Sequence, residues 1–368
     1  MKEQSSVAVV ILNWNGKKFL EDFLPSVYSS TYENLQIIVA DNHSTDDSRE
    51  FLLKSGFEIY NAAEASAGKK YLIELPENYG FAKGYNLAMA EIKSEYAILL
   101  NSDVEVSPSW IEPIIEMMKT DPQIAAAMPK VLMQSQKSLF EYAGAAGGWM
   151  DKYGYPFCRG RIFGKLEEDL GQYNNKSEIF WASGAAFFVR TELFNTIGGF
   201  DADYFAHMEE IDLCWRLKKA NYKIMFCPES TVWHVGGGTL QAESPKKVYL
   251  NFRNSLSTLL KNKESASSVI LSVFIRLLLD GVAGMMFLAK GKFSHIGAII
   301  KAHWHFFAGM GRDWKKRNAN QQIIKALAFN KNPSLNKKGI YNKSIVFQHF
   351  VKKVSKFTDL GIKDQKLT

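Results

Sequence analysis

The sequence has little cysteine and lacks the signature motifs of several common enzyme classes. Only three cysteines, Cys158, Cys214 and Cys227, occur in 368 residues. They are too few and too widely spaced for a disulfide framework or a CxxC zinc site, which predicts a reducing compartment. The chain has no GxGxxG after a predicted strand, no GxxxxGK[ST], no HExxH and no GxSxG. An NAD-dependent oxidoreductase, a P-loop kinase, a zincin and an α/β-hydrolase are therefore disfavoured.

We also expect no N-terminal export signal. The one apolar stretch near the N-terminus, Val7 to Leu12, is too short for the hydrophobic region of a signal peptide. We therefore expect the catalytic part to be cytoplasmic. With 46% hydrophobic and 23% charged residues, the composition is that of a folded protein with one large domain or two.

Charge is distributed unevenly along the chain. Residues 1–240 carry 22 Lys and Arg against 32 Asp and Glu, whereas residues 241–368 carry 23 against 6. The overall net charge of +7 therefore conceals an acidic body and a basic tail. We expect a catalytic domain at 1–240 and a basic, α-helical region at 241–368 that binds an anionic partner.

An apolar segment in the basic region bears on membrane binding. Ser268 to Ala289 is long enough to span a bilayer, but it contains Arg276 and Asp280, each costing about 2.5–3.5 kcal/mol at mid-bilayer. The basic residues around it and around a second apolar stretch, Ile296 to Phe307, are Lys290, Lys292, Lys301, Arg312, Lys315, Lys316 and Arg317. This pattern favours helices on an anionic membrane surface, peripheral on the inner face of the cell membrane. A buried helical subdomain and a true span are the alternatives, and nucleic acid is not expected as a partner because no binding motif accompanies these lysines.

Apolar runs alternate with amphipathic segments along the body. The runs predict strands at 7–12, 35–40, 72–75 and 96–100, and helical spacing predicts helices at 17–30, 47–54, 82–91 and 110–118. After an irregular Gly/Tyr-rich stretch at 142–163, we expect a strand at 179–190 and helices at 192–197 and 210–220. The alternation predicts an α/β fold with a mainly parallel central sheet and ligands at the carboxyl ends of its strands.

Two segments contain candidate metal ligands. Asn101-Ser102-Asp103 directly follows a predicted strand, and the Asp103 carboxylate can hold Mg²⁺ or Mn²⁺ against a diphosphate. An Asx turn or a helix cap is the alternative. His234 precedes Gly236-Gly237-Gly238-Thr239, so it is either a metal ligand beside a phosphate-contacting loop or a satisfied core residue.

Titratable residues are dense after the Gly198-Gly199-Phe200 turn. Within twelve positions the chain has Asp201, Asp203, His207, Glu209, Glu210 and Asp212. Mutual repulsion should raise the pKa of one carboxyl toward the range of a general base. The alternative is a group of acidic residues that complements the dipole of the following helix.

Six segments, taken in order, resemble family 2 glycosyltransferases of the GT-A fold, in particular the bacterial rhamnosyltransferase-like members that build surface polysaccharides. The segments are VVILNWNG, IIVADNHSTDDS, ENYGFAKGYNLA, YAILLNSDVEV, FWASGAAFFVRTELFNTIGGFD and EEIDLCWRLKKANYKIMFCPESTVWHVGGGT. The resemblance runs from about Val7 to Thr239, and it implies a Rossmann-like sheet with flanking helices.

The resemblance also implies roles for individual residues. The residues expected at the nucleotide-sugar donor are Asn13, Asn15, Asp41, Asn78, Gly84 and Asn101, with Asp41 at the base. Asp103 stands at the metal-binding end of the DxD position, and His234 is a second protein ligand for Mn²⁺ or Mg²⁺. Trp181, Ser183 and Gly184 are expected near the acceptor.

Glu210 occupies the position of the catalytic base in the family's acidic motif. That motif usually ends in Asp, so neighbouring Glu209 is the alternative base, and Asp212 is expected to brace the helix. The QxxRW motif of the processive synthases is missing, so one sugar is expected per binding event.

These features together predict an inverting, metal-dependent, non-processive glycosyltransferase. It would move a sugar, rhamnose being a candidate, from a UDP- or dTDP-sugar to a lipid-linked saccharide acceptor in surface polysaccharide synthesis. A nucleotidyltransferase or sugar-nucleotide pyrophosphorylase and a non-catalytic GT-A-like scaffold are the alternatives.

Overall fold

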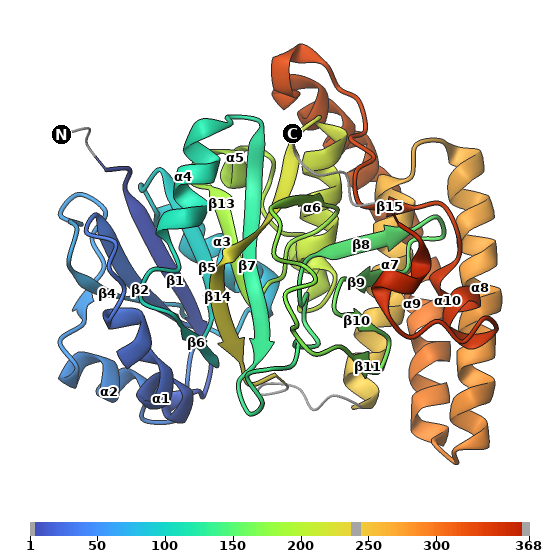
Figure 1. The fold of residues 1–368 in the computed structure, drawn as a ribbon, viewed down its shortest axis with the longest axis horizontal. Helices are drawn as coiled ribbons and strands as arrows, with labels where there is room; N and C mark the ends of the chain where they lie inside the picture. Colours follow the sequence, from blue (N-terminus) through green and yellow to red (C-terminus); the bar gives the residue numbers. More distant parts are fainter. Residues whose placement is uncertain (1–3, 237–243, 363–368) are drawn as a thin grey trace.

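The structure, a computed structural model, describes residues 4–236 and 244–362 (Figure 1). A layered α/β body occupies most of it, and three long helices pack against one end of that body. The expected boundary at residue 240 and the predicted loop residues 237–239 lie outside the described residues.

The body is built on one large mixed sheet. Its strands lie in the order β12-β14-β7-β13-β5-β1-β2-β4-β3, and β6 pairs with β14. These strands are β1 (Val7–Asn13), β2 (Leu35–Asp41), β3 (Glu58–Ile59), β4 (Lys70–Glu74), β5 (Tyr96–Asn101), β6 (Val104–Val106), β7 (Ile124–Met133), β12 (Ser177–Ile179), β13 (Ala186–Arg190) and β14 (Lys223–His234). The pairs from β3 through β5 are all parallel, whereas β13 runs antiparallel to β5 and β7. The predicted α/β fold with a mainly parallel central sheet is confirmed.

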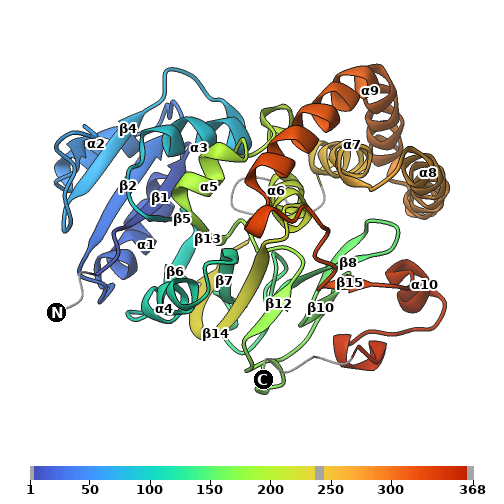
Figure 2. The ribbon, with the colours of Figure 1, turned by 90° about the horizontal axis from the view of Figure 1, so that it is seen from above.

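Helices cover both faces of this sheet. They are α1 (Lys17–Tyr28), α2 (Ser48–Lys54), α3 (Gly80–Glu91), α4 (Glu112–Thr120), α5 (Thr191–Thr196) and α6 (Glu209–Lys219). Seen from above, α1 and α4 lie on one face, and α3 and α5 lie on the other (Figure 2). Helix α1 illustrates the cause, because Leu20, Leu24 and Val27 recur at helical spacing and all three are buried. The predicted helices are confirmed, with ends shifted by a few residues.

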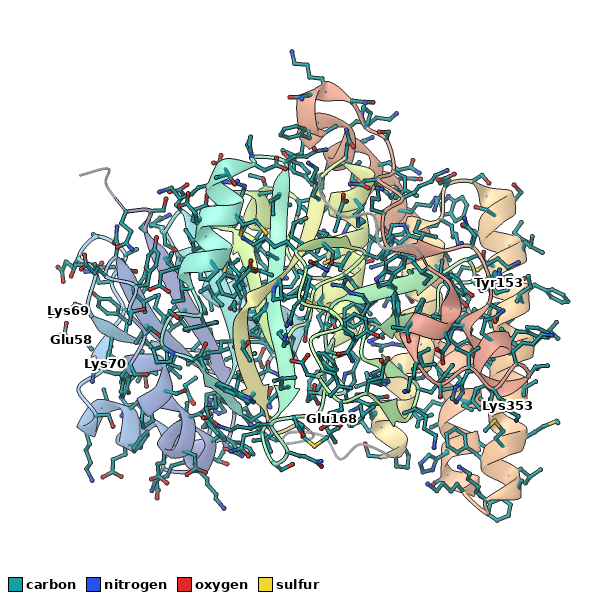
Figure 3. The ribbon with its side chains drawn as sticks, viewed as in Figure 1. Glu58, Lys69, Lys70, Tyr153, Glu168 and Lys353 are labelled. Atoms are coloured by element: carbon teal, nitrogen blue, oxygen red, sulfur yellow. The ribbon has the colours of Figure 1, made fainter. Side chains whose placement is uncertain are left out.

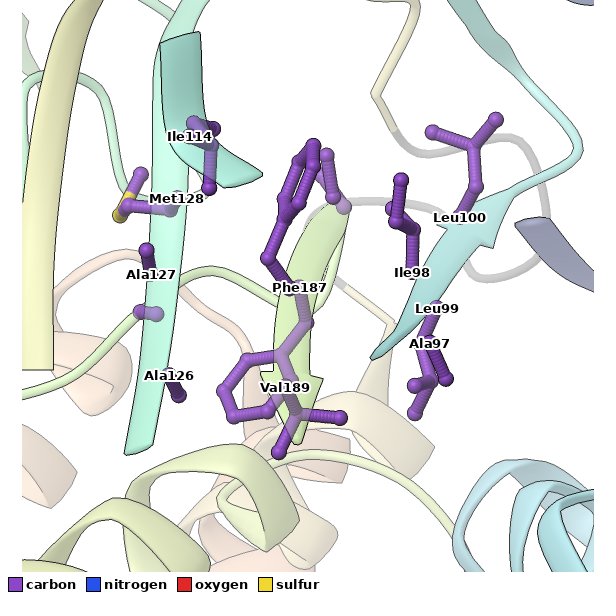
Figure 4. Close-up of a cluster of buried hydrophobic side chains, with 14 of the residues drawn as sticks. Ala97, Ile98, Leu99, Leu100, Ile114, Ala126, Ala127, Met128, Phe187 and Val189 are labelled. Atoms are coloured by element: carbon purple, nitrogen blue, oxygen red, sulfur yellow. The ribbon is translucent and has the colours of Figure 1, made fainter. Parts of the chain in front are cut away.

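Buried apolar side chains cluster where β13 lies between β5 and β7 (Figure 4). Phe188 and Val189 of β13 pair with Ala127 and Ala126 of β7, so small side chains on one strand leave room for larger ones on the next.

At one edge of the sheet, the short strand β3 carries Glu58. Its carboxylate lies 2.9 Å from Lys69 Nζ (Figure 3), a charged edge of the kind that opposes pairing with other chains.

The strand predicted at 179–190 is wrong in its extent. Two short strands form instead, β12 and β13, separated by a loop at 180–185. The reason is the topology, because β12 pairs with β14 near the edge of the sheet and β13 pairs with β5 and β7 inside it. The chain has to cross the sheet between the two strands.

A second sheet contains the stretch that the sequence shows as irregular. Its strands lie in the order β11-β10-β9-β8-β15. They are β8 (Gly148–Asp151), β9 (Pro156–Cys158), β10 (Arg161–Ile162), β11 (Lys165–Leu166) and β15 (Ile340–Tyr341). Strand β15 comes from the C-terminal region and pairs in parallel with β8. The chain after Leu327 thus differs from the expected helical region, because it returns to the body and buries Tyr341, Phe357 and Leu360 in the main core.

The basic region begins with three packed helices, α7 (Pro245–Asn262), α8 (Ala266–Ala289) and α9 (Phe293–Leu327), and later forms the short α10 (Ile345–Phe350). Single 3-10 turns lie at η1 (Ala202–Tyr204), η2 (Phe329–Lys331) and η3 (Phe357–Leu360). Several cations of the basic region pair with acidic residues of the body. Lys261 Nζ lies 2.5 Å from Asp201 and 3.0 Å from Asp212, and Lys316 also pairs with Asp201. One anionic partner of the basic region is therefore the body itself.

Candidate active site

Three of the predicted donor residues lie side by side at the carboxyl ends of parallel strands. Asn13 at the end of β1 is in register with Asp41 at the end of β2. On the other side of β1, Leu12 is in register with Asn101 at the end of β5. The parallel register explains this arrangement, because strand ends that are far apart in sequence meet at one edge of the sheet.

The Asp41 carboxylate is held in place by its neighbours. Asn13 Nδ2 donates to it at 3.1 Å, and the Ser44 backbone N–H and hydroxyl donate at 2.9 and 2.6 Å. Asn15, at a φ of 51°, accepts from the Thr45 N–H at 2.7 Å through Oδ1. The loops after β1 and β2 are thus fastened to each other, with a buried carboxylate between them that can accept from a nucleotide base.

Asn78 and Gly84 hold the loop and helix behind this edge. Asn78 Oδ1 accepts from Asn42 Nδ2 at 3.1 Å and from the Gly80 N–H at 2.9 Å. A Cβ at Gly84 would lie 3.0 Å from the Leu12 side chain and 3.3 Å from Asn42 Nδ2, so glycine lets α3 approach β1 closely. This buried position serves helix packing, and the donor contact expected at Gly84 stays a prediction.

Asp103 and His234 form the predicted pair. His234, the last residue of β14, is in register with Val104 of β6, which directly follows Asp103. Its Nε2 lies 3.2 Å from Asp103 Oδ1, and both side chains are buried. Burial lowers the pKa of His234, but the carboxylates of Asp103 and Glu141 outweigh this and raise the pKa to about 10.

Glu141 is a site residue that the sequence analysis missed. It is buried at 4% exposure, and its Oε2 lies 3.3 Å from His234 Nδ1, on the far side of the ring from Asp103. Its position in the irregular stretch after β7 gave no periodicity or motif that could have identified it. The imidazole is thus held between two carboxylates.

The Asp103–His234 pair has a separation that suits one divalent ion. Two neighbouring ligands of an octahedral ion at about 2.1 Å are about 3.0 Å apart, close to the 3.2 Å between Oδ1 and Nε2. Among the residues that the structure describes, no three His, Cys, Asp or Glu side chains are grouped to hold a metal. An ion bound there would replace the proton on His234 Nε2 and would take its remaining ligands from a diphosphate and water.

Glu209 and Glu210 are the first two residues of helix α6. The loop before them contains three residues with positive φ values, Phe205 at 55°, His207 at 70° and Met208 at 75°. Burial raises the pKa of Glu210 to about 7, and burial together with the Glu210 charge raises the pKa of Glu209 well above its usual range. One oxygen of each carboxyl, Oε2, has no hydrogen-bond partner among the described residues.

The carboxylates of the site also act on two buried groups. Asp103 and Glu209 both add to the burial that raises the pKa of the Tyr85 phenol. Burial likewise raises the pKa of the Cys158 thiol, and the charges of Glu141 and Glu210 act in the same direction. Both groups therefore stay protonated near neutral pH.

The rest of the acidic cluster serves a structural purpose. Asp212 Oδ2 accepts from Arg216 Nε at 3.0 Å, and its Oδ1 accepts from Asn262 Nδ2 at 2.7 Å. The predicted bracing role of Asp212 is confirmed. Asp201 is paired with Lys261 and Lys316, and these cations outweigh burial and lower its pKa.

The residues expected near the acceptor lie in the loop between β12 and β13. Trp181 is buried and its Nε1 donates to the Trp149 carbonyl at 3.0 Å. The Ser183 hydroxyl donates to the Ala143 carbonyl and accepts from the Ala185 N–H. These side chains hold the loop together, whereas Gly184 is half-buried and leaves its backbone open beside Phe81.

The fold matches solved structures of nucleotide-sugar-dependent enzymes. A mannosyltransferase from Pyrobaculum calidifontis, in complex with GDP-Man and Mn²⁺, covers 90% of this chain and 89% of its own, with a TM-score of 0.51 and 12% identity. GalNAc-T7, with UDP, GalNAc and Mn²⁺, covers 71% of this chain, with a TM-score of 0.53 and 17% identity. This chain covers 48% of GalNAc-T7. The fold is therefore that of the GT-A glycosyltransferases.

The chain belongs to glycosyl transferase family 2, whose family model matches residues 8–198. Among its relatives is the N-acetylglucosaminyl-diphospho-decaprenol L-rhamnosyltransferase of Mycobacterium tuberculosis, 24% identical over 241 residues, which are 61% of this chain and 75% of the relative. The rhamnosyltransferase WbbL of Escherichia coli is 23% identical over 229 residues, 60% of this chain and 80% of WbbL. The resemblance to the rhamnosyltransferase-like members is thereby confirmed, and the protein is a glycosyltransferase of glycan synthesis.

Proposed function

We propose that this glycosyltransferase is metal-dependent and inverting, and that it adds one sugar from a nucleoside-diphosphate sugar to a lipid-linked saccharide. The observation that carries the proposal is the pairing of Asp103 with His234, together with the carboxyl oxygens of Glu209 and Glu210 that have no hydrogen-bond partner among the described residues. The first pair fits a cation on the leaving diphosphate, and the second supplies a base for the acceptor. Residues 1–240 are proposed as the catalytic domain and 241–368 as the membrane-associating region.

The donor side uses the carboxyl ends of β1, β2 and β5. Asp41 would accept from the nucleotide base, with Asn13 and Asn15 fixing its loop and Asn101 beside the diphosphate. Asp103 and His234 would hold Mn²⁺ or Mg²⁺, which neutralises charge on the departing diphosphate. Glu141 would fix the ring of His234, as a carboxylate behind a metal-bound histidine commonly does.

The acceptor side uses the acid pair at the start of α6. Glu210 is half-buried and Glu209 is buried at 4% exposure, which favours Glu210 as the group that reaches an acceptor hydroxyl. A pKa of about 7 lets the carboxylate accept a proton near neutral pH. The hydroxyl oxygen then forms a bond to the anomeric carbon while the bond to the diphosphate breaks on the opposite face, which inverts the configuration.

The named relatives support the substrate classes. The Mycobacterium relative is named for a diphospho-decaprenol acceptor and an L-rhamnosyl group, and two matched structures contain nucleotides with Mn²⁺. A UDP- or dTDP-sugar donor, with rhamnose as the candidate sugar, and a lipid-diphosphate acceptor follow by analogy. Such an acceptor requires a peripheral position on the inner face of the cell membrane.

A transfer assay with a panel of nucleotide sugars tests this proposal. The protein would be mixed with Mn²⁺, UDP- and dTDP-sugars and a short-chain lipid-diphosphate saccharide, and products would be analysed by mass spectrometry and by NMR of the new anomeric proton. We expect one added sugar of inverted configuration, and a loss of about 10²-fold or more in kcat for Glu210→Gln. A retained configuration, or full activity of Glu210→Gln, would refute the mechanism.

A further inference from the structure

Helices α8 and α9 form a hairpin with an apolar outer face. On α8, Ile270, Phe274, Leu278 and Met285 recur at helical spacing, and Ile270 and Met285 are 71% and 67% exposed. On α9, Ile300 and Trp304 continue the surface, with Trp304 at 73% exposure. Contiguous exposed apolar surface of this kind marks an interaction site.

The two charges within α8 point the other way. Arg276 and Asp280 are 5% and 1% exposed. Arg276 donates to the Gly154 carbonyl at 3.2 Å and to the Ser255 hydroxyl at 2.9 Å, while Asp280 accepts from the Tyr155 hydroxyl at 3.3 Å. Among the described residues, α8 is the helix that is long and apolar enough to cross a membrane. The two buried charges hold α8 against the body, and α8 could cross a membrane only by breaking these contacts.

The outer face is also free of exposed acid. From Ser265 to Lys316 the only carboxylates are Asp280 and Asp313, and both are buried. Basic side chains are exposed in the same stretch, including Lys290 at the hairpin turn and Lys301 on α9. The charged side chains exposed on α8 and α9 are basic, and one exposed carboxylate, Glu264, lies just before α8. An apolar face with this excess of positive charge complements an anionic lipid surface.

The hairpin lies beside the acceptor side of the site. Tyr249 of α7 hydrogen-bonds His305 of α9 at 2.6 Å, and the Lys301 ammonium lies 5.6 Å from the centre of the Tyr249 ring. The same helix α7 holds the loop before Glu209 through Asn254. The hairpin turn extends toward the side of the molecule where β7 and β14 end (Figure 1).

We propose that the outer face of α8 and α9 docks into the headgroup layer of an anionic bilayer and does not cross it. Docking there would hold the catalytic body, to which α9 is joined through α7, close to the membrane surface. The use of this position for a lipid-linked acceptor rests on the proposed function, whereas the docking itself does not.

Vesicle flotation of the full chain tests the docking. Phosphatidylcholine vesicles with and without phosphatidylglycerol would be compared for the wild type and for a triple variant, Phe274→Ser, Leu278→Ser and Trp304→Ser. Leu170→Ser is the matched control, because Leu170 is 79% exposed on the body. We expect the wild type and the control to float with anionic vesicles and the triple variant to remain in the soluble fraction. Circular dichroism would verify that each variant is folded.

Two neutralised lysines give an independent test that leaves the apolar face intact. Lys290→Gln and Lys301→Gln should each weaken binding to anionic vesicles about fivefold, since one lysine near such a surface contributes about 1 kcal/mol. Unchanged flotation of all variants, or no flotation of the wild type, would overturn the proposal. A wild-type dimer that the triple variant converts to a monomer would assign the face to a second copy instead. Calorimetric donor binding should be the same in every variant, so a failure of docking is distinct from a failure of the proposed catalysis.

Discussion

Replacing Asn254 with alanine should loosen the loop that precedes the proposed base. The Asn254 amide is fully buried, and Nδ2 lies 3.1, 3.0 and 2.7 Å from the carbonyls of Tyr204, Ala206 and His207. One amide nitrogen carries two hydrogens, so two of these hydrogen bonds are fully formed at a time. A buried carbonyl left without a donor costs about 1–3 kcal/mol. Two such carbonyls would cost about 2–6 kcal/mol, and because Ala206 and His207 are only half-buried, we expect the free energy of unfolding to fall by about 2–4 kcal/mol, the lower part of that range.

Urea denaturation and steady-state kinetics together check this prediction. The loop should become mobile around Glu210, so kcat should fall while the affinity for the donor, which binds at the ends of β1, β2 and β5, stays unchanged. Asn251→Ala is the matched control on the same helix, because within the described residues its amide donates to the Lys247 carbonyl one turn earlier, at 2.9 Å, and to no other group. The reasoning would be refuted if the free energy of unfolding of Asn254→Ala lay within about 0.5 kcal/mol of the wild-type value, or if its kcat equalled that of the wild type.

Three further changes test other parts of the structure. Glu141→Gln should weaken Mn²⁺ binding about 10–100-fold in calorimetry, because His234 loses the carboxylate that orients its ring; unchanged affinity would remove Glu141 from the site. The kcat should rise with pH through about 7, since burial raises the pKa of Glu210 and only its ionised form accepts a proton; a flat pH profile of the wild type would contradict this assignment. Gly339→Ala should detach β15 and speed hydrogen exchange there, because Gly339 has a φ of 81° and an added Cβ would overlap the backbone of Phe180; unchanged exchange would contradict this.

The elements that the sequence predicted well depend on local pattern. The apolar run at 7–12 ends in Asn13, and the run at 96–100 leads to Asp103, so both strands and the residues at their carboxyl ends could be predicted from neighbouring positions. The parallel register then brings Asn13, Asp41 and Asn101 to one edge. Periodicity alone was sufficient for this part of the fold.

The features that the sequence did not predict depend on contacts between distant segments. Glu141 belongs to the site only because β14 returns His234 to it. The cluster at 201–212 divides into a bracing part and an unpaired part because Lys261 and Lys316 reach Asp201 from the C-terminal helices. Strand β15 is two residues long and pairs with β8 across about half of the chain, and no local pattern specifies such a pairing.

Calorimetric titration of the protein with UDP, dTDP and their sugar conjugates, with and without Mn²⁺, tests the central claim most directly. The experiment would be run on the wild type and on Asp103→Ala. Our account predicts tight binding of one nucleoside diphosphate that requires both Mn²⁺ and Asp103. Equal binding without the metal, or by Asp103→Ala, would contradict the assignment of Asp103 and His234 as the metal-holding pair.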